Sequence, residues 1–385
     1  MKRLLLINPV CGLGSTGKIV AGIASEYEEN GWEVKIAHGR KLNVPQNCRR
    51  WSERIGGMFS VYIHALAVRF WGDYGLGYLK SYFSTKAFLR RMDKWKPTVV
   101  WLHNIHGYYV NVELLFEWLK QHPEIEVKWT LHDCWSFTGR CGHFMISGCE
   151  QWKSHCVKCP RTFKGRNQLL SRNCYNDYER KRQAFAGVRQ MSLIAPCAWL
   201  ANLTRQSFLR EYPVSVVRNK IDTSIFKHVD SKLRSKNNWV GKIVILGVAA
   251  VWNSNKGIDD YLQLRTQLDS SKYVIVMVGL TRKQIRHMPK GIYCVEKTAN
   301  VDQLVEYYST ADWFFNPTHE DNYPTVNLEA KACGCRIATY DTGGAPETIE
   351  GYKRGWVLYG DDRTPDGFVR LLKNCNEKTV FKGME

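Results

Sequence analysis

The chain has 385 residues, of which 44% are hydrophobic, and it carries a formal net charge of +19 with a pI near 9.4. The length predicts two domains of ordinary size. The positive charge favours a polyanionic partner, such as nucleic acid, an anionic membrane surface or a phosphorylated substrate, although a solvated basic surface would give the same total. The run at positions 55–68, which contains no Asp, Glu, Lys or Arg, is too short to span a bilayer.

Cysteine content and the N-terminal sequence bear on the compartment. The apolar run at residues 4–8 is too short for a secretory signal. Without such a signal, thirteen cysteines indicate a reducing compartment. We therefore expect a cytoplasmic protein, soluble or peripheral on the inner face of the cytoplasmic membrane.

The chain begins with a predicted strand, a glycine-rich turn and a helix. Residues 4–8 predict the buried strand, residues 12–18 the turn and residues 18–29 the helix. This order can place a phosphate at the helix N-terminus, with Gly14 as the candidate contact. A plain tight turn is the alternative, because the spacing does not match a P-loop.

Residues 49–96 combine many aromatic side chains with Lys and Arg. Amphipathic helices of this composition suit an anionic membrane interface, and they could also suit a nucleic-acid groove. The third interpretation is that the aromatic residues form ordinary core while the charges face solvent.

Two further strands are predicted at residues 98–102 and 126–131, and the first of them ends at His103. A histidine at a strand end can bind a sugar hydroxyl in a cleft, although such a residue is often structural. His106, in the same loop, is the competing candidate.

Four cysteines follow the second of these strands. Cys156 and Cys159 have the spacing of a metal knuckle, whereas Cys141 and Cys149 are spaced more widely than in zinc ribbons. Structural zinc on these four residues, free thiols and disulfides are the three interpretations. The basic segment 161–182 predicts a surface loop and a helix.

Strands alternate with helices along the whole chain, which predicts an α/β fold with parallel sheets. We place the domain boundary after residue 195. The predicted organisation is a first domain at residues 1–195, a second at 196–365, and a C-terminal helix at 366–385 that could return to the first domain. Strands of the second domain are predicted at residues 243–249, 273–278, 292–295, 311–316 and 336–340.

Residues 316–349 carry the strongest functional signal. Glu320 and Asp321 follow a predicted strand, and Glu329 lies on the helix that begins near Pro324. Ligands of open α/β sheets bind beyond the carboxyl ends of the strands, and a helix start offers free N–H groups to an anion or to sugar hydroxyls. The alternative is an ordinary acidic loop and helix.

Seven residues separate Asp321 from Glu329, and Ala332-Cys333-Gly334 follows shortly after. This pattern resembles the acidic-x7-acidic signature of retaining GT-B glycosyltransferases of family 4, the group 1 enzymes. The resemblance implies two Rossmann-like domains that face each other across a cleft. It also implies that Glu329 holds the ribose of a nucleotide-sugar, while either Glu320 or Asp321 fills the first acidic, catalytic role.

The same resemblance implies roles for other positions. Lys256 matches a lysine that neutralises the donor diphosphate, although the arginine that usually accompanies it is absent. Thr298 matches the nucleobase position, Gly14 the loop near the donor phosphates, and His103 a residue at the donor sugar. The remaining implied donor contacts are Asn322, Tyr323, Pro324 and Thr325.

We therefore expect a metal-independent retaining hexosyltransferase that needs no cofactor for catalysis and uses a UDP-sugar in preference to a GDP-sugar. The expected acceptor is a glycan or lipid-linked glycan of surface polysaccharide or lipopolysaccharide biosynthesis, met at an anionic membrane. Nucleic acid is not an expected partner. The alternatives are a nucleotide-sugar epimerase or phosphorylase on the same fold, or a basic nucleic-acid-binding protein with a zinc knuckle.

Overall fold

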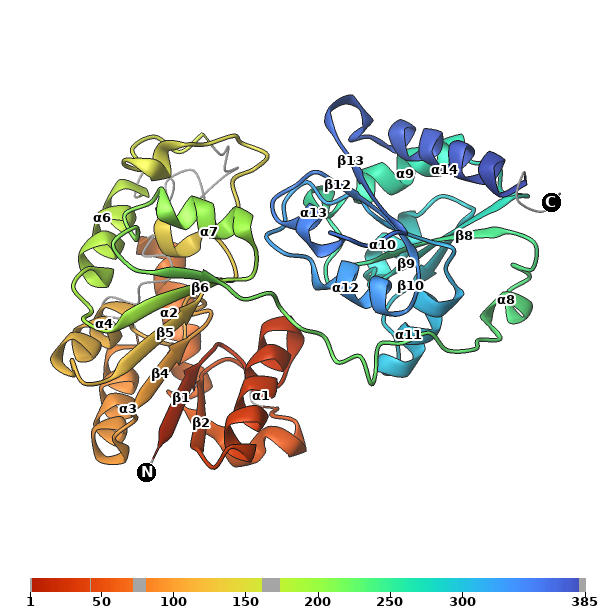
Figure 1. Ribbon diagram of the computed structural model, residues 1–385. Helices are drawn as coiled ribbons and strands as arrows, with labels where there is room; N and C mark the ends of the chain where they lie inside the picture. Colours follow the sequence, from red (N-terminus) through yellow and green to blue (C-terminus); the bar gives the residue numbers. More distant parts are fainter. Residues whose placement is uncertain (1, 42, 72–80, 161–173, 381–385) are drawn as a thin grey trace. The chain divides into compact units, whose positions relative to one another are not determined.

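The computed structural model describes residues 2–41, 43–71, 81–160 and 174–380, with side chains except at 68–71 and 376–380. The chain divides into two units, Met1–Asn219 and Lys220–Glu385. Each unit is built on one parallel sheet flanked by helices, which confirms the predicted α/β class (Figure 1).

The division between the units falls after Asn219 and not after residue 195 as expected. β7 (Val214–Val216) pairs in parallel with β6 (Met191–Ala195), and α7 (Ala198–Arg205) packs against both strands. The backbone hydrogen bonds of this ladder hold residues 198–216 in the first unit. Because β7 has only three residues and is largely exposed, the sequence gives little indication that this strand belongs to the first unit.

The first unit contains a seven-stranded sheet in the order β3-β2-β1-β4-β5-β6-β7. β1 pairs with both β2 and β4, so the strand order reverses there. The carboxyl ends of β1 and β4 therefore form a topological switch point, where ligands of such sheets bind. The other strands are β1 (Arg3–Ile7), β2 (Glu33–His38), β3 (Ser52–Arg54), β4 (Val99–Leu102) and β5 (Glu126–Thr130).

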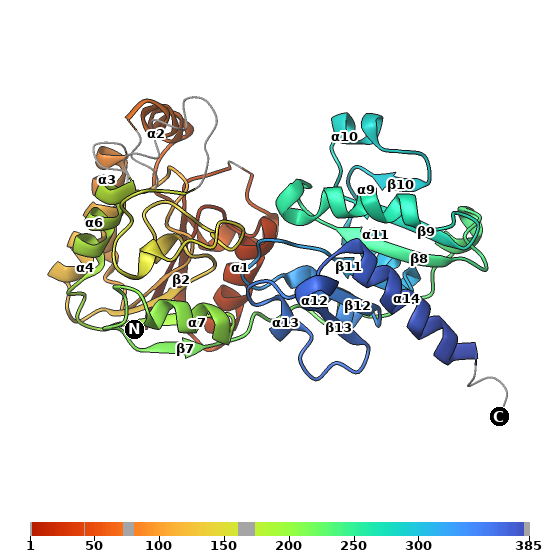
Figure 2. The same cartoon turned by 90° about the horizontal axis from the view of Figure 1, so that it is seen from above.

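Helices cover both faces of this sheet. α1 lies on one side of the strands, whereas α3, α4 and α6 lie next to one another on the other (Figure 1, Figure 2). Of the predicted basic loop and helix, residues 161–173 lie outside the described residues, and the helix is α6. The helices are α1 (Gly14–Glu29), η1 (Gln46–Trp51), α2 (Met58–Trp71), α3 (Tyr82–Trp95), α4 (Val112–Gln121), η2 (Trp135–Phe137), η3 (Gln151–Lys153) and α6 (Cys174–Phe185).

The second unit contains a six-stranded sheet in the order β10-β9-β8-β11-β12-β13, and β8 with β11 marks its switch point. The five strands predicted for this domain are all present. The strands are β8 (Ile243–Val248), β9 (Tyr273–Val278), β10 (Ile292–Val295), β11 (Trp313–Asn316), β12 (Arg336–Tyr340) and β13 (Gly355–Leu358). The helices are α8 (Leu233–Lys236), η4 (Ser254–Lys256), α9 (Ile258–Gln267), α10 (Arg282–His287), α11 (Val301–Thr310), α12 (Thr325–Ala332), α13 (Ala345–Thr348), η5 (Gly360–Asp362) and α14 (Pro365–Val380).

Side chains of alternate strand residues build one core on each face of this sheet. Phe314 packs with Tyr308 of α11 on one face, and Phe315 packs with Tyr261 of α9 on the other. The C-terminal helix α14 also belongs to this second core, because Phe368 stacks on Phe315 with ring centroids 4.1 Å apart. The first turns of the predicted C-terminal helix are therefore anchored in the second unit.

Candidate functional site

The loop after β11 carries the two acidic residues singled out by the sequence. Oδ2 of Asp321 lies 2.6 Å from Nζ of Lys256, and the same ammonium donates to the backbone oxygen of Glu320 at 3.1 Å. Lys256 ends η4 in the loop after β8, the strand next to β11. The sheet topology thus brings a cation and an acidic residue together at the switch point.

Glu320 and Asp321 have different surroundings. The side chain of Glu320 is buried, and its Oε2 accepts a hydrogen bond from Nδ2 of Asn255 at 2.9 Å. The side chain of Asp321 is 22% exposed and forms the ion pair. A buried carboxylate with a fixed partner holds the loop in place, whereas Asp321 can be reached by a ligand. Asp321 is therefore the stronger candidate for the first acidic role.

α12 carries Glu329 and begins directly after Pro324, which caps the helix. The hydroxyl of Tyr308, on α11, donates to Oε2 of Glu329 at 2.9 Å. Burial, reinforced by the Glu329 carboxylate, raises the pKa of Tyr308 well above its usual range, so the phenol keeps its proton. One oxygen of the half-buried Glu329 is thus oriented by the fold.

The other predicted donor contacts of this unit are spread along the carboxyl edge of the sheet. Asn322 and Tyr323 are buried beside the acidic residues, and Thr325 begins α12. Thr298 lies in the loop after β10, the edge strand two places from β8. The sheet order therefore separates Thr298 from the acidic loop, and its role at a nucleobase stays a prediction.

Gly343 allows a close backbone approach that fixes the acidic loop. Its φ is +57°, and a Cβ added at this position would lie 1.9 Å from the backbone oxygen of Asp321. The neighbouring Gly344 donates its N–H to the backbone oxygen of Asn322 at 3.0 Å. Glycine is therefore required here both by the backbone conformation and by the space available.

Gly343→Ala is expected to displace Asp321 and to lower the free energy of unfolding of the second unit by about 2 kcal/mol or more, because the methyl group cannot be accommodated. Urea unfolding of the full chain measures the change. Gly360→Ala is the matched control, since Gly360 also has a positive φ but no atom within 4 Å of an added Cβ. Equal stability of the two variants would contradict the expectation.

In the first unit, a pocket opens at the carboxyl ends of β4 and β5. His103 directly follows β4 and is buried, with its Nδ1 3.0 Å from Nε2 of His132 and the two rings stacked. Nε2 of His106 lies 2.8 Å from Oδ2 of Asp133. The residues that line the pocket are His103, Asn104, Ile105, His106, Trp129, Thr130, Leu131, His132, Asp133, Trp135 and Ser136.

Three buried polar atoms of these lining residues find no hydrogen-bond partner within the described part of the chain. They are Nε2 of His103, Nε1 of Trp135 and Oγ of Ser136. Such atoms are costly when unpaired, so they indicate a bound ligand or ordered water. A ligand rich in hydroxyl groups could both donate to and accept from this set.

The pocket combines two neutral imidazoles with an ionised carboxylate. Burial lowers the pKa of His103 well below its usual range, and His132 beside it lowers it further. Burial also lowers the pKa of His132, to about 4. Burial acts to raise the pKa of Asp133, but His106 and the backbone N–H of Trp135 outweigh this and hold it at about 2.

Because the folded-state pKa of His132 lies below that of an unfolded histidine, about 6.5, the folded chain binds fewer protons than the unfolded chain in this range. The stabilising contribution is complete above pH 6.5 and is lost as the pH falls towards 4. His132→Gln is expected to reduce this loss by up to about 1.4 kcal/mol per pH unit.

Urea unfolding of the full chain at pH 7, 6 and 5 tests this pH dependence. His122→Gln is the control in the same unit, because the side chain of His122 is 29% exposed. The His122 variant should keep the pH dependence of the unaltered chain. A His132 variant with that same dependence would contradict the assignment.

The glycine-rich turn leads into α1, whose first residue is Gly14 with φ +68°. Space around an added Cβ at Gly14 is open, whereas Gly12 lies against Cys48, whose Sγ would be 2.6 Å away. Glycine is thus required at position 12, because a side chain there would clash with Cys48. The predicted role of Gly14 at a phosphate stays a prediction.

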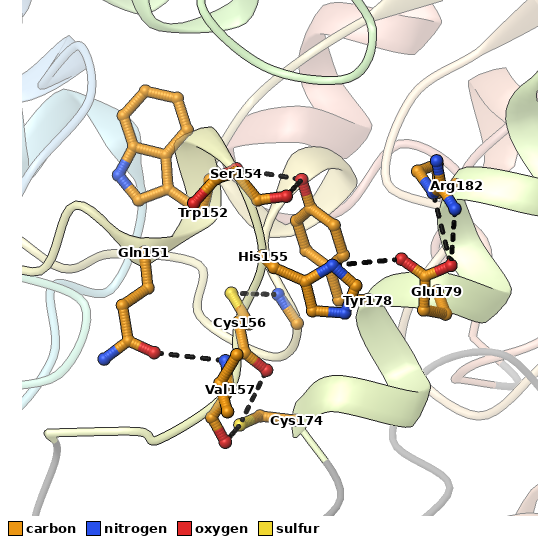
Figure 3. A network of polar contacts seen from close by, with 11 residues as sticks. Gln151, Trp152, Ser154, His155, Cys156, Val157, Cys174, Tyr178, Glu179 and Arg182 are labelled. Carbon is orange, nitrogen blue, oxygen red and sulfur yellow. Dashed lines mark hydrogen bonds and ion pairs between the residues drawn. The ribbon is translucent and has the colours of Figure 1, made fainter.

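The cysteine-rich segment after β5 packs against α6, as Figure 3 shows. Within the described ranges, no group of three or more His, Cys, Asp or Glu side chains is arranged to hold a metal ion. The predicted zinc on Cys141, Cys149, Cys156 and Cys159 is therefore not supported. Burial raises the pKa of the Cys156 thiol to about 11.

Polar contacts to α6 hold this segment instead. The hydroxyl of Tyr178 donates to the backbone oxygens of Trp152 and Ser154 at 3.1 Å, and His155 lies 3.3 Å from Glu179 (Figure 3). The buried ammonium of Lys181 donates to three backbone oxygens of the segment 135–139. Because this segment contributes Trp135 and Ser136 to the pocket, α6 supports the pocket wall.

Three residues that position the candidate site residues are not among those predicted from the sequence. Tyr308 lies in a segment that gives no local sign of a role. Asn255 precedes Lys256, but nothing local indicates its bond to Glu320, which is distant in the chain. Asp133 did offer a signal, because it lies in the loop after β5, and His103 lies at the start of the loop after β4. Neighbouring parallel strands bring such positions together.

Residues 242–375 match the family glycosyl transferases group 1. This range contains Lys256, Asp321 and Glu329. The chain is 37% identical over 99 residues to the putative colanic acid biosynthesis glycosyl transferase WcaC of Escherichia coli, covering 25% of this chain and 22% of that protein. It is 24% identical over 220 residues to the alpha-maltose-1-phosphate synthase of Mycobacterium tuberculosis, covering 50% and 57%. The matches thus span less than two thirds of the length of these relatives.

Solved structures of similar fold include sucrose-phosphate synthase from Thermosynechococcus elongatus, with a TM-score of 0.69 at 14% identity over 97% of this chain and 90% of that one. Another is Anabaena HepE in complex with UDP, with a TM-score of 0.60 at 14% identity over 98% and 91%. At such identity the likeness concerns the fold alone. The likeness to the group 1 glycosyltransferases thus rests on residues 242–375 of the second unit, whereas the likeness in fold to these solved structures extends over nearly the whole chain.

Proposed function

We propose that the chain transfers a hexose from a UDP-sugar, with retention of configuration, to a glycan or lipid-linked glycan of surface polysaccharide biosynthesis. The ion pair of Lys256 with Asp321, beside the start of α12, carries this proposal. A nucleotide-sugar offers a diphosphate to the lysine, sugar hydroxyls to Asp321 and ribose hydroxyls to Glu329. All three residues lie within the family match.

In the proposed step, the bond between the anomeric carbon and the β-phosphate oxygen breaks, and its electron pair stays with UDP. The acceptor oxygen bonds to the same face of that carbon, and its proton passes to the leaving phosphate oxygen. Lys256 exchanges its partner Asp321 for the diphosphate and stabilises the charge that grows there. No side chain is needed as a base in this scheme, and the reaction needs no metal ion.

The pocket of the first unit is proposed to bind sugar hydroxyls. Its unpaired atoms on His103, Trp135 and Ser136 suit hydroxyl groups, and neutral imidazoles with the ionised Asp133 disfavour an anion. Gly14 is proposed to lie near the donor phosphates and Thr298 near the base. The assignment of UDP is supported by HepE, a protein of similar fold that has been solved with UDP.

The glycan acceptor is supported by WcaC, which is named for colanic acid biosynthesis. A lipid-linked acceptor would bring the reaction to the cytoplasmic face of the membrane. An anionic lipid surface is also consistent with the net charge of +19.

A thermal-shift panel of UDP- and GDP-sugars tests the donor assignment, because a ligand that binds only the folded chain raises its Tm. We expect stabilisation by a UDP-hexose and, on adding acceptor, release of UDP. Stabilisation by none of the nucleotide-sugars would contradict the proposal. Conversion of the donor to an isomer without any acceptor would indicate an epimerase instead.

A further inference from the structure

α2 presents an apolar stripe to solvent. Phe59, Tyr62, Ile63 and Leu66 are 78%, 69%, 46% and 56% exposed. Their spacing of i, i+3, i+4 and i+7 places them on one face of the helix. Large apolar side chains that are scattered singly over a surface need no explanation, but a contiguous stripe marks an interaction site.

Another face of α2 packs against the rest of the first unit. Nδ1 of the buried His64 lies 2.8 Å from Oγ of Ser81, and Oγ of Ser60 lies 3.1 Å from Oγ of Ser84. Ala67 is buried as well. One side of the helix is thus anchored by these contacts, and the apolar stripe remains exposed to solvent. Figure 2 shows α2 at the outside of the first unit, beyond α3.

α3 adds an aromatic side chain and a row of cations. Phe83 is 83% exposed and precedes Ser84, which contacts α2. Lys86, Arg90 and Lys94 are also exposed. The spacing i, i+3, i+7 and i+11 puts Phe83 and the three cations on one face of α3. Because Ser84 contacts Ser60 of α2, the basic row begins beside the helix that carries the apolar stripe.

The charge of this surface selects its partner. Neither α2 nor residues 82–92 of α3 contain Asp or Glu. Apolar and aromatic side chains beside Lys and Arg match the acyl boundary and headgroups of an anionic bilayer. None of the helices in the described ranges is long and apolar enough to cross a membrane, so such contact would be interfacial. Residues 72–80 of the predicted basic and aromatic stretch lie outside the described residues.

We propose that the stripe Phe59, Tyr62, Ile63 and Leu66, with Phe83, inserts into the interface of an anionic lipid bilayer. Lys86, Arg90 and Lys94 then contact the lipid headgroups. This deepens the proposed function, since it names the surface through which a lipid-linked acceptor is approached. The binding itself does not depend on any sugar transfer, so the two proposals can fail separately.

Co-sedimentation of the full chain with vesicles tests the proposal. Phosphatidylglycerol mixed with phosphatidylcholine should bind the chain, and phosphatidylcholine alone should bind it at least about tenfold more weakly. The triple variant Phe59→Ser, Tyr62→Ser, Leu66→Ser should lose about tenfold or more in binding to the anionic vesicles. Replacing Lys86, Arg90 and Lys94 with Gln should weaken binding to a similar extent and reduce its salt dependence.

A control variant changes exposed apolar residues elsewhere, Val240→Ser with Tyr359→Ser, and should bind as the unaltered chain does. Urea unfolding of every variant checks that each is folded. No binding of the unaltered chain to anionic vesicles would overturn the proposal. A triple Ser variant that binds the anionic vesicles as well as the unaltered chain does would also overturn it. A third contrary outcome is that neither protein binds vesicles, while the unaltered chain self-associates and the triple variant does not.

Discussion

Replacing Lys256 with methionine is expected to lower kcat for sugar transfer by about 10²- to 10³-fold. In the structure its ammonium is held between the Asp321 carboxylate and the backbone oxygen of Glu320, at 2.6 and 3.1 Å. This fixed cation would face the diphosphate as the glycosidic bond breaks. Methionine keeps the length of the side chain but removes the charge. Initial rates of UDP release at saturating donor measure the effect.

Two further variants test whether the loss of the positive charge at Lys256 causes the expected fall in kcat. Lys256→Arg keeps a cation and should retain much more activity than the methionine variant. Lys290→Met removes an exposed lysine from the same unit and should leave kcat unchanged. A Lys256→Met enzyme that stays within a few-fold of the unaltered enzyme would exclude this lysine from leaving-group stabilisation.

Glu329→Gln is expected to raise KM for the donor by about 10- to 100-fold with little change in kcat. A hydrogen bond to a charged group contributes about 1.5–3 kcal/mol, and the ribose would be held equally in the ground and transition states. Glutamine conserves the shape of the side chain and removes only the charge. Steady-state kinetics with varied donor, together with donor binding by calorimetry, measure the change.

Tyr308→Phe provides a second, smaller effect on the same contact. It removes the hydroxyl that donates to Glu329 at 2.9 Å, so KM for the donor should rise only a few-fold. Glu306→Gln changes a carboxylate two residues earlier, on the opposite side of α11, and should leave KM unaltered. A Glu329→Gln variant with normal donor affinity would remove the ribose assignment.

Strand positions and the acidic signature could be predicted because each depends on local residues. The runs at residues 243–249 and 273–278 became β8 and β9, since apolar side chains are needed on both faces of a covered sheet. Asp321 and Glu329 are close in the sequence, and a loop followed by a helix fixes their separation. Pro324, expected at the first helical position, caps α12 immediately before it.

Contacts between distant segments could not be predicted. The predicted boundary after residue 195 puts β7 in the second domain, and only the hydrogen bonds of β7 to β6 place this strand in the first unit. α4 is not among the predicted helices, although Asn111 caps it and its apolar residues recur at helical spacing. The zinc interpretation rests on the Cys-x-x-Cys spacing and on four nearby cysteines in a reducing compartment, and neither observation says where the side chains point.

The sequence by itself determined the α/β class, most of the strands, the family resemblance and the acidic pair with its helix. Only the tertiary structure decided that Lys256 pairs with Asp321, that Glu320 turns inward to Asn255, and that Tyr308 orients Glu329. It also decided that α2 buries His64 and exposes Phe59. The physical reason is that periodicity records which side chains share a face, whereas the neighbours that cover each face come from other strands and helices.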